Sequence, residues 1–241
     1  MTNKLPRRER QLIERENLIL ETARGLIREN GFLSLKMSQL AEAVEYSVGT
    51  LYTHFETKED LLVSLAVQSI SQRANLFEKA QEAKRKSRDR IYGILIARLM
   101  LAETGPEIFD IERLAASPSV WKRATQERYQ KMVAMEQRCS EIVLSIIVDA
   151  ISEGDLALGS VRETDIVFGL WSLTIGFHRL MLSFDDLSRV GVLDINEAVK
   201  INYCILLDSY GWQPLKDWDH NTVEKDFREN VLFFKITVDT S

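Results

Sequence analysis

The stretch LAEAVEYSVGTLYTHF, residues 40–55, decides the fold, because it has the pattern of two short helices joined by a tight turn. Apolar residues recur at helical spacing over 37–44, where we expect the first of these helices. Ser47 is a favourable N-cap for a second helix over 48–55. Two short helices of this kind predict a helix-turn-helix, whose second helix enters the major groove of DNA.

The second of these helices carries side chains suited to nucleic acid. Leu51 and Phe55 are four residues apart and anchor one face inward, while the N-terminus offers free N–H groups to a phosphate. The other positions present small or hydrogen-bonding groups that reach bases and phosphates, namely Ser47, Thr50, Tyr52, Thr53 and His54.

A longer helix is expected on each side of this pair. Residues 14–30 have helical apolar spacing and end at Gly31, a residue that often terminates helices. The sequence Thr57-Lys-Glu-Asp60 has the pattern of a capping box and opens a long fourth helix.

Residues 40–55, followed by Thr57-Lys-Glu-Asp-Leu-Leu62, resemble the DNA-binding module of the TetR (tetracycline-repressor-like) family. The resemblance covers about residues 14–65. It implies that Thr50 faces bases, that Tyr52, His54 and Lys58 contact phosphates, that Ser47 caps the recognition helix beside the DNA backbone, and that Gly49 lets this helix approach closely.

The sequence departs from the family pattern at three places. Glu45 stands where a turn glycine is usual, and a non-glycine residue at positive φ costs about 1 kcal/mol. Val48 replaces a usual Lys or Arg, which removes a phosphate contact or replaces it with an apolar contact to a thymine methyl. Lys36 and Met37 stand where Thr or Ser usually opens the helix, so Lys36 or Ser38 takes that phosphate contact. The full set of expected DNA contacts is Lys36, Ser38, Gln39, Tyr46, Ser47, Val48, Gly49, Thr50, Tyr52, Thr53, His54 and Lys58.

The module defines a predicted domain division, with DNA binding in residues 1–60 and ligand sensing and dimerisation in 61–241. The N-terminal arm carries four basic residues, which either form a solvated terminus or lie on the DNA backbone. These residues are Lys4, Arg7, Arg8 and Arg10.

The composition favours an all-α architecture. The chain has 241 residues, of which 45% are hydrophobic, and only 4 prolines and 11 glycines, too few for a turn-rich β-sandwich. The formal net charge of -5 excludes a broadly basic nucleic-acid coat, so DNA binding has to be local. Cys139 and Cys204 belong to no CxxC pair, and no apolar run reaches membrane-spanning length. The basic start of the sequence has no apolar run behind it, so we do not expect it to be a signal peptide. These features predict a cytoplasmic protein.

Helical spacing continues beyond the module to about residue 210. Two further capping boxes are expected, at Ser160 with Glu163 and at Asp194 with Glu197. The end of the chain is ambiguous, because 223–234 suits a helix while 233–238 has strand-like composition. The expected helices are 88–103, 106–116, 118–153, 162–184 and 194–210, with Pro106 and Pro118 in first turns.

The helix over 162–184 is apolar nearly all round and has to be covered on both sides. We expect it to pair with 194–210 of a second copy across a twofold axis, as a four-helix bundle. The predicted interface residues are Ile166, Leu170, Leu173, Phe177, Ala198, Ile205 and Ser209.

The same half of the chain is expected to enclose an effector pocket. The predicted lining is apolar with few polar groups, which favours a mostly hydrophobic ligand between an aromatic acid and a short acyl chain in size. His178 either is a hydrogen-bonded core residue or orients a ligand carbonyl or carboxylate. The predicted lining residues are Leu99, Met100, Phe109, Met135, Trp171, Ile175 and His178.

An enzyme is not expected. The chain has three histidines, no Glu-x-x-His pair, no Gly-rich phosphate loop and no nucleophile elbow, so we expect no cofactor and no metal. The sequence therefore predicts a homodimeric DNA-binding regulator, most simply a repressor, that a small hydrophobic molecule releases from a palindromic operator. The alternative is a helical sensor or adaptor without operator binding.

Overall fold

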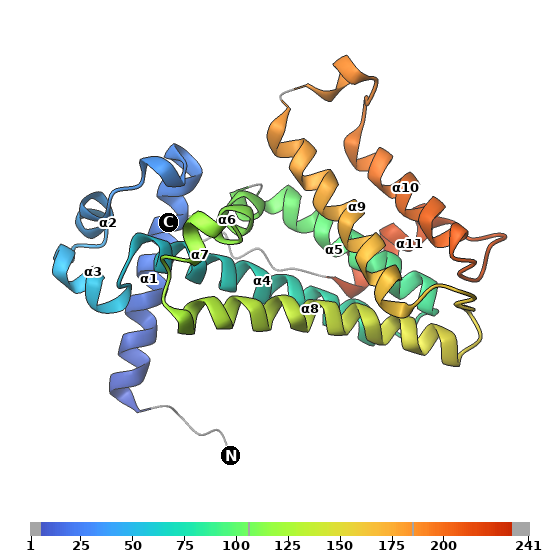
Figure 1. The fold of residues 1–241 in the computed structure, drawn as a ribbon, viewed down its shortest axis with the longest axis horizontal. Helices are drawn as coiled ribbons and strands as arrows, with labels where there is room; N and C mark the ends of the chain where they lie inside the picture. Colours follow the sequence, from blue (N-terminus) through green and yellow to red (C-terminus); the bar gives the residue numbers. More distant parts are fainter. Residues whose placement is uncertain (1–5, 106, 185, 233–241) are drawn as a thin grey trace. The chain divides into compact units, whose positions relative to one another are not determined.

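A computed structural model describes residues 6–105, 107–184 and 186–232, and within these ranges the chain forms helices and no strand (Figure 1). The expected all-α architecture is confirmed. The chain divides into two compact units. The first unit comprises the chain up to Ile70 together with 107–134, and the second comprises 71–106 together with the chain from Met135 onward.

The first unit contains the three helices of the predicted module and is closed by segments from later in the sequence. Ile19, Leu40, Leu51 and Phe55 are fully buried in it, so the amphipathic faces read from the sequence do form its core. Its elements are α1 (Arg7–Asn30), η1 (Phe32–Ser34), α2 (Met37–Ala43), α3 (Val48–His54), the start of α4 (Lys58–Glu82), α6 (Glu107–Ala115), α7 (Pro118–Trp121) and the start of α8 (Gln126–Ser152).

The second unit is built around α5 (Ser87–Thr104), most of whose residues are buried. Gly93 of α5 lies against Phe227, and a Cβ atom there would be 2.1 Å from the phenyl ring, so only glycine permits this approach. Against α5 pack α10 (Ile195–Ser209), α11 (His220–Asp226) and the π-helical turn η3 (Phe227–Val231). The unit also contains the ends of α4 and α8, together with α9 (Glu163–Ser183) and η2 (Leu187–Val190).

The helix expected over 118–153 is two helices, since α7 ends at Trp121 and α8 begins at Gln126. The reason is a contact that the sequence does not show. The carboxylate of Asp60 accepts hydrogen bonds from the backbone N–H and the hydroxyl of Thr125, at 2.7 and 3.0 Å. These bonds satisfy a donor at the start of α8, where a new helix can then begin.

Some of the helix caps expected from the sequence are confirmed and one is wrong. Ser47 and Asp194 cap α3 and α10, each accepting from the backbone N–H three residues later. The box at Ser160 is wrong, because α9 begins at Glu163 after Arg162, whose backbone N–H donates to Asp165. At Thr57 the hydroxyl accepts from the N–H of Asp60 at 2.9 Å, as expected, although the Asp60 carboxylate turns to Thr125.

Three sequence expectations fall partly or wholly outside the described residues. These are the place of Pro106 in a first turn, the basic residue Lys4 of the N-terminal arm, and the strand-like segment 233–238. The ambiguous segment before that last one is helical as far as it is described, through α11 and η3. Arg7, Arg8 and Arg10 are exposed in the first turn of α1.

One helix among the described residues, α9, is long and apolar enough to cross a membrane by length and composition alone. Core helices of soluble proteins meet the same criterion, and one such helix is weak evidence for a membrane span. Ile166, Leu170 and Phe177 on α9 are buried within the second unit, where α9 packs against α10.

Candidate nucleic-acid interface

The turn between α2 and α3 has the left-handed conformation that the family pattern gives to glycine. Glu45 occupies it with φ of 56°, so the turn keeps its shape at the cost of about 1 kcal/mol of backbone strain. The next residue closes the turn, because the N–H of Tyr46 donates to the carbonyl of Ala41 at 2.9 Å. The positive φ considered for this position in the sequence analysis is therefore present, with Glu45 adopting it.

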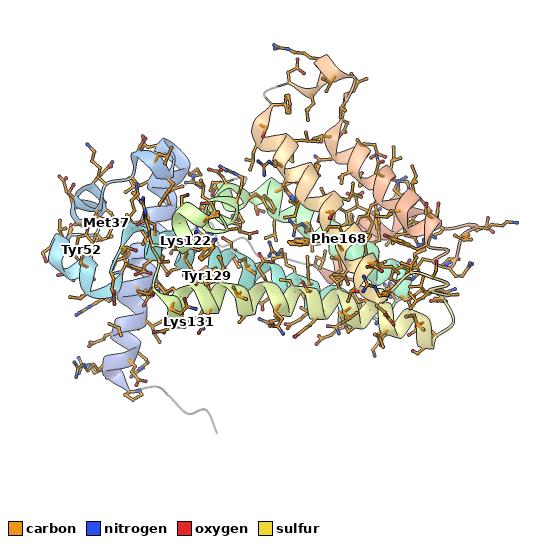
Figure 2. The ribbon with its side chains drawn as sticks, viewed as in Figure 1. Met37, Tyr52, Lys122, Tyr129, Lys131 and Phe168 are labelled. Carbon is orange, nitrogen blue, oxygen red and sulfur yellow. The ribbon has the colours of Figure 1, made fainter. Side chains whose placement is uncertain are left out.

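One face of α3 is held in the core and the other is open. Leu51 and Phe55 are fully buried, while Val48 and Tyr52 are 39% and 47% exposed. Figure 2 shows Tyr52 projecting outward from α3. At the start of the helix, the Ser47 hydroxyl accepts from the N–H of Thr50 at 3.0 Å. The cap leaves the first N–H groups of α3 directed toward solvent, where they can meet a phosphate.

The hydroxyl groups of α3 are ordered by local hydrogen bonds. The Thr50 hydroxyl lies 2.8 Å from that of Ser47, and the Thr53 hydroxyl donates to the Thr50 carbonyl at 2.7 Å. Each of these groups can exchange its local partner for a base or phosphate at small cost, because water-exposed hydrogen bonds contribute little net free energy.

Lys58 begins α4 and lies over η1. Its ammonium group is 3.4 Å from the carbonyl of Leu33 and 4.4 Å from the centre of the Phe32 ring. Partial burial lowers the pKa of Lys58 below its usual value. The side chain is thus directed by the first unit itself, which reduces the conformational entropy lost if it binds a phosphate.

The remaining predicted DNA contacts lie at the surface of the same unit. Lys36, Ser38 and Gln39 are exposed at the start of α2, as is Gly49 in α3, whereas Tyr46 and His54 are half-buried. Met37 points inward and is 8% exposed. The structure therefore brings the predicted residues together on α2, α3 and the start of α4, and their individual roles on DNA stay predictions.

The sequence analysis did not identify Arg128, a residue of α8 whose side chain binds the end of α3. Its guanidinium donates to the backbone carbonyl of His54 at 2.6 Å and to Glu16 of α1 at 3.0 Å, and it also donates to the hydroxyl of Ser64 in α4. It lies 4.6 Å from the centre of the Phe55 ring. No local pattern signals this residue, because its partners are 64 to 112 positions away.

The predicted effector residues do not form one cluster. Leu99 and His178 are buried, Trp171 and Ile175 are exposed, and Phe109 belongs to the first unit rather than the second. Only Trp171 of the predicted set lines the cavity of about 50 Å³ that the second unit encloses among α4, α5, α8, α9 and α10. That cavity also carries Arg73 and Arg98, so it is not the apolar pocket with few polar groups that the sequence analysis expects.

His178 has the hydrogen-bonded core position that was one of its two interpretations. Its Nδ1 lies 2.6 Å from the carbonyl of Thr174 and 3.4 Å from Arg98. The shorter contact identifies Nδ1 as a donor to the carbonyl, and a protonated nitrogen cannot also accept from the guanidinium. Burial, followed by the charges of Arg98 and Arg73, lowers the pKa of His178 to about 3.

The predicted dimer residues separate into two groups. Ile166, Leu170 and Phe177 are at most 4% exposed within this single chain, so they belong to its core and have little surface left for a partner. The other four reach the surface or a groove. Leu173 and Ala198 line an apolar groove of about 450 Å³ between α9 and α10, to which the buried Phe177 also contributes, and Ile205 and Ser209 are exposed on α10.

Several solvent-facing residues of these two helices are apolar as well. Phe168 and Ile175 on α9 are 64% and 44% exposed, and Ile201 and Ile205 on α10 are 45% and 55% exposed. Figure 2 labels Phe168 on α9. An apolar surface on two adjacent helices is typical of a protein interface.

Comparison with known proteins matches the first unit directly. The sequence model described as bacterial regulatory proteins, tetR family, matches residues 19–65. The fatty acid metabolism regulator protein of Bacillus subtilis (strain 168) is 23% identical over 159 residues, which cover 65% of this chain and 79% of that protein.

Solved structures extend the likeness to most of the chain. The TetR family transcriptional regulator PfmR from Thermus thermophilus has a TM-score of 0.61 and 21% identity, covering 79% of this chain and 97% of that one. AibR, solved in complex with isovaleryl coenzyme A and operator DNA, has a TM-score of 0.58 and 16% identity, covering 82% and 99%. At these identities the likeness concerns the fold.

The fold and the exposed face of α3 define a helix-turn-helix DNA-binding protein. Residues 19–65 therefore match the DNA-binding domain of the tetR family of bacterial regulatory proteins, and the remainder shares its helical fold with a solved regulator of that family.

Proposed function

We propose that this chain is a homodimeric, cytoplasmic repressor that binds a palindromic operator and is released from it by a small organic molecule. The observation that carries the DNA-binding part is the face of α3, on which Tyr52 and Thr53 are exposed while Leu51 and Phe55 anchor the helix. In a dimer, two such helices enter successive major grooves about 34 Å apart.

The apolar surface of α9 and α10 supports the dimer. Placing a second copy over Phe168, Ile175, Ile201 and Ile205 removes these side chains from water, at about 25 cal/mol for each Å² of apolar surface covered. A twofold axis makes each residue contribute twice, so a small patch gives a stable association.

The named relatives support a small organic effector. One is named as a regulator of fatty acid metabolism, and another was solved with an acyl coenzyme A and operator DNA together. An effector of this protein acts if it binds more tightly to a conformer whose two recognition helices no longer fit the operator. The extent of release is limited by that difference in affinity.

The direct test is selection of bound fragments from a genomic DNA library by the purified protein. We expect a palindromic site whose half-sites are about one helical turn apart or somewhat more. Recovery of unrelated fragments with no common sequence would contradict operator binding and favour a helical sensor without DNA.

Substitutions in the first unit distinguish base contacts from phosphate contacts. Thr50→Ala is expected to relax base preference, whereas Lys58→Ala weakens binding to all sequences alike and lowers the slope of log affinity against log salt by about one. Lys122→Ala, in the segment after α7, is the matched control and leaves the slope unchanged. Fluorescence anisotropy across a salt series measures these effects. An unchanged slope for Lys58→Ala excludes its phosphate contact.

A further inference from the structure

The segment that follows α10 closes over α5. It comprises residues 212–232, which we call the clasp, and its helical parts α11 and η3 pack against α5. Its apolar side chains Trp212, Phe227 and Leu232 are all fully buried. Because both ends of the clasp are buried, the core of the second unit holds this segment in place.

Arg88 of α5 binds the start of the clasp. Its side chain is 2% exposed, and its guanidinium donates to the backbone carbonyl of Trp212 and to the carboxylate of Asp208. The same guanidinium lies 4.2 Å from the centre of the Trp218 ring, whose indole N–H donates to Asp89 at 2.7 Å. A buried charge is stable only where such partners surround it. The first turn of α5 is thus bound to the clasp.

The middle of α5 receives the clasp at Gly93. A Cβ atom at this position would be 2.1 Å from Cε1 of Phe227, and the phenyl ring is fully buried, so it cannot turn away without displacing its neighbours. Glycine is less favourable than alanine within a helix. The docking of Phe227 therefore gives the glycine at this position a structural role.

A network of charged side chains fixes the other end of α5. Arg228 of the clasp donates from its two terminal nitrogens to the two carboxylate oxygens of Glu103 in the last turn of α5, at 2.9 Å each. Its Nε donates to Glu224 at 2.8 Å, and Glu224 also accepts from Lys200 of α10 at 3.0 Å. Isolated surface ion pairs contribute little, but bidentate pairs and networks are exceptions. The clasp therefore joins the last turn of α5 to α10.

The two helices that the clasp joins lead to different parts of the proposed dimer. α5 ends at Thr104, and the next helix, which begins at Glu107, belongs to the first unit. α10 carries Ile201 and Ile205, the exposed apolar residues assigned above to the dimer surface. A stiff connection between two binding modules raises the effective concentration at which the second module binds once the first is bound.

We propose that the clasp fixes α5 to α10 and thereby keeps the two recognition helices of the dimer at the spacing that a palindromic operator requires. The inference rests on the proposed function for its dimer and its operator. A closed clasp favours binding of the full operator, whereas a loosened clasp leaves each DNA-binding unit able to bind a half-site alone. The segment after α10 thereby has a role in DNA binding without contacting DNA.

Hydrogen exchange measures whether the clasp holds α5. Glu103→Gln removes the charge that binds Arg228, and Gly93→Ala places a methyl group against Phe227. In both variants we expect the backbone amides in the last turn of α5 to exchange roughly tenfold or more faster, because local opening becomes easier. Glu78→Gln is the control, since Glu78 forms an ion pair of the same unit outside the clasp. Unchanged rates in either clasp variant, or equal acceleration in the control, overturn the proposal.

A compensating substitution assigns the effect of Gly93→Ala to the clasp. Phe227→Leu makes room for the added methyl group, so the combined variant should exchange more slowly than Gly93→Ala alone. Gly25→Ala is the control for helix propensity, because a Cβ atom there would meet nothing within 4 Å, and it should raise the melting temperature. If the combined variant exchanges as fast as Gly93→Ala alone, the contact with Phe227 does not hold α5 and the proposal fails.

Fluorescence anisotropy relates the clasp to DNA. The probes are the palindromic fragment selected from the genomic library and one of its half-sites. In Glu103→Gln and Gly93→Ala we expect the ratio of full-site to half-site affinity to fall roughly tenfold, while Glu78→Gln keeps the wild-type ratio. A merely structural role lowers both affinities alike and leaves their ratio unchanged. An unchanged ratio together with faster exchange therefore overturns the proposal.

Failure of the proposed function gives a different result. If the wild-type protein itself binds no palindrome more tightly than a half-site, the dimeric operator complex is wrong. The exchange measurement needs no DNA, and it decides separately whether the clasp fixes α5.

Discussion

Arg128 connects α3 to two other helices of the first unit. Its guanidinium connects Glu16 of α1, the backbone carbonyl of His54 at the end of α3, and Ser64 of α4. A single side chain with three helices as partners fixes their relative position in a way that apolar packing alone does not, because hydrogen bonds are directional.

Arg128→Met is expected to lower the free energy of unfolding by about 1–3 kcal/mol, since it removes hydrogen bonds to a carboxylate and to a buried helix end. Operator affinity should fall by more than the loss of folded protein explains, because α3 is no longer fixed. Arg138→Met, a surface arginine of the same helix paired with Glu78, is the control and should leave operator affinity unchanged. Urea denaturation and anisotropy measure both effects, and equal DNA affinity of the two variants would contradict this role of Arg128.

Substitution by glycine is expected to have opposite effects on stability at two nearby positions, Glu45 and Glu42. Glu45→Gly should stabilise the protein by about 0.5–1 kcal/mol, because φ is 56° at this position and glycine adopts it without steric cost. Glu42→Gly, at an exposed position in the last turn of α2, should destabilise it by roughly 0.5–1 kcal/mol, because glycine lowers helix propensity. Thermal denaturation of both variants gives the comparison, and a destabilised Glu45→Gly would show that the side chain of Glu45 contributes more than its backbone costs.

His178 predicts a dependence of stability on pH. In the unfolded chain this histidine takes up a proton below its ordinary pKa of 6.5, whereas in the folded protein it stays neutral down to a pKa of about 3. The unfolded state therefore binds more protons between these values, and stability falls as the pH falls through this range. The contribution is about 2 kcal/mol between pH 6.5 and 5.

His178→Asn should remove this part of the pH dependence while an amide N–H still reaches the Thr174 carbonyl. Guanidinium denaturation at several pH values, with the wild-type curve subtracted, isolates the histidine from the carboxylates that titrate in the same range. A variant whose stability falls with pH as steeply as that of the wild type would mean that His178 is not held neutral.

At the scale of the elements, the sequence predicted those features of the helices that depend on residues close together in the chain. Ser47 and Asp194 were identified as caps because the acceptor and the donor are three residues apart. The break before α8 was missed because it depends on Asp60 and Thr125, which are 65 residues apart. Helical periodicity continues across that break, so the pattern alone predicts one long helix.

The same difference separates the candidate DNA interface from the cavity of the second unit. The predicted DNA contacts lie on short, consecutive elements, and a linear motif therefore predicted which of them share a surface. The arginines of the cavity come from α4 and α5, and each sits in a helix whose pattern gives no sign that a charge is buried. Only the packing of five helices around them shows it.

For the whole molecule, the predicted dimer residues lie on α9 and α10, and three of them, Ile166, Leu170 and Phe177, are buried within the chain. An apolar helix has both an inward and an outward stripe, and sequence alone does not say which is which. Burial within the chain settles this, since Ile166 and Leu170 are core residues while Phe168 is 64% exposed. Apolar residues of α9 thus lie both in the core of its unit and at its surface, and together they give this helix the hydropathy of a candidate membrane span.

The last prediction concerns assembly. We expect the wild-type protein to sediment as a dimer at micromolar concentration, and Phe168→Glu and Ile205→Glu each to raise the dimer dissociation constant by roughly a hundredfold or more. The twofold axis places every substitution in the interface twice, so two apolar contacts are lost and two carboxylates are desolvated together. Both variants should also lose affinity for the full operator while a single half-site is bound as before, because linking two modules is what raises their joint affinity.

Val148→Glu, which changes an exposed apolar residue of α8 that is 52% accessible, is the matched control and should remain dimeric. Sedimentation velocity over a range of concentrations decides the matter: if both interface variants stay dimeric while Val148→Glu dissociates, the second copy binds α8 and not the surface of α9 and α10.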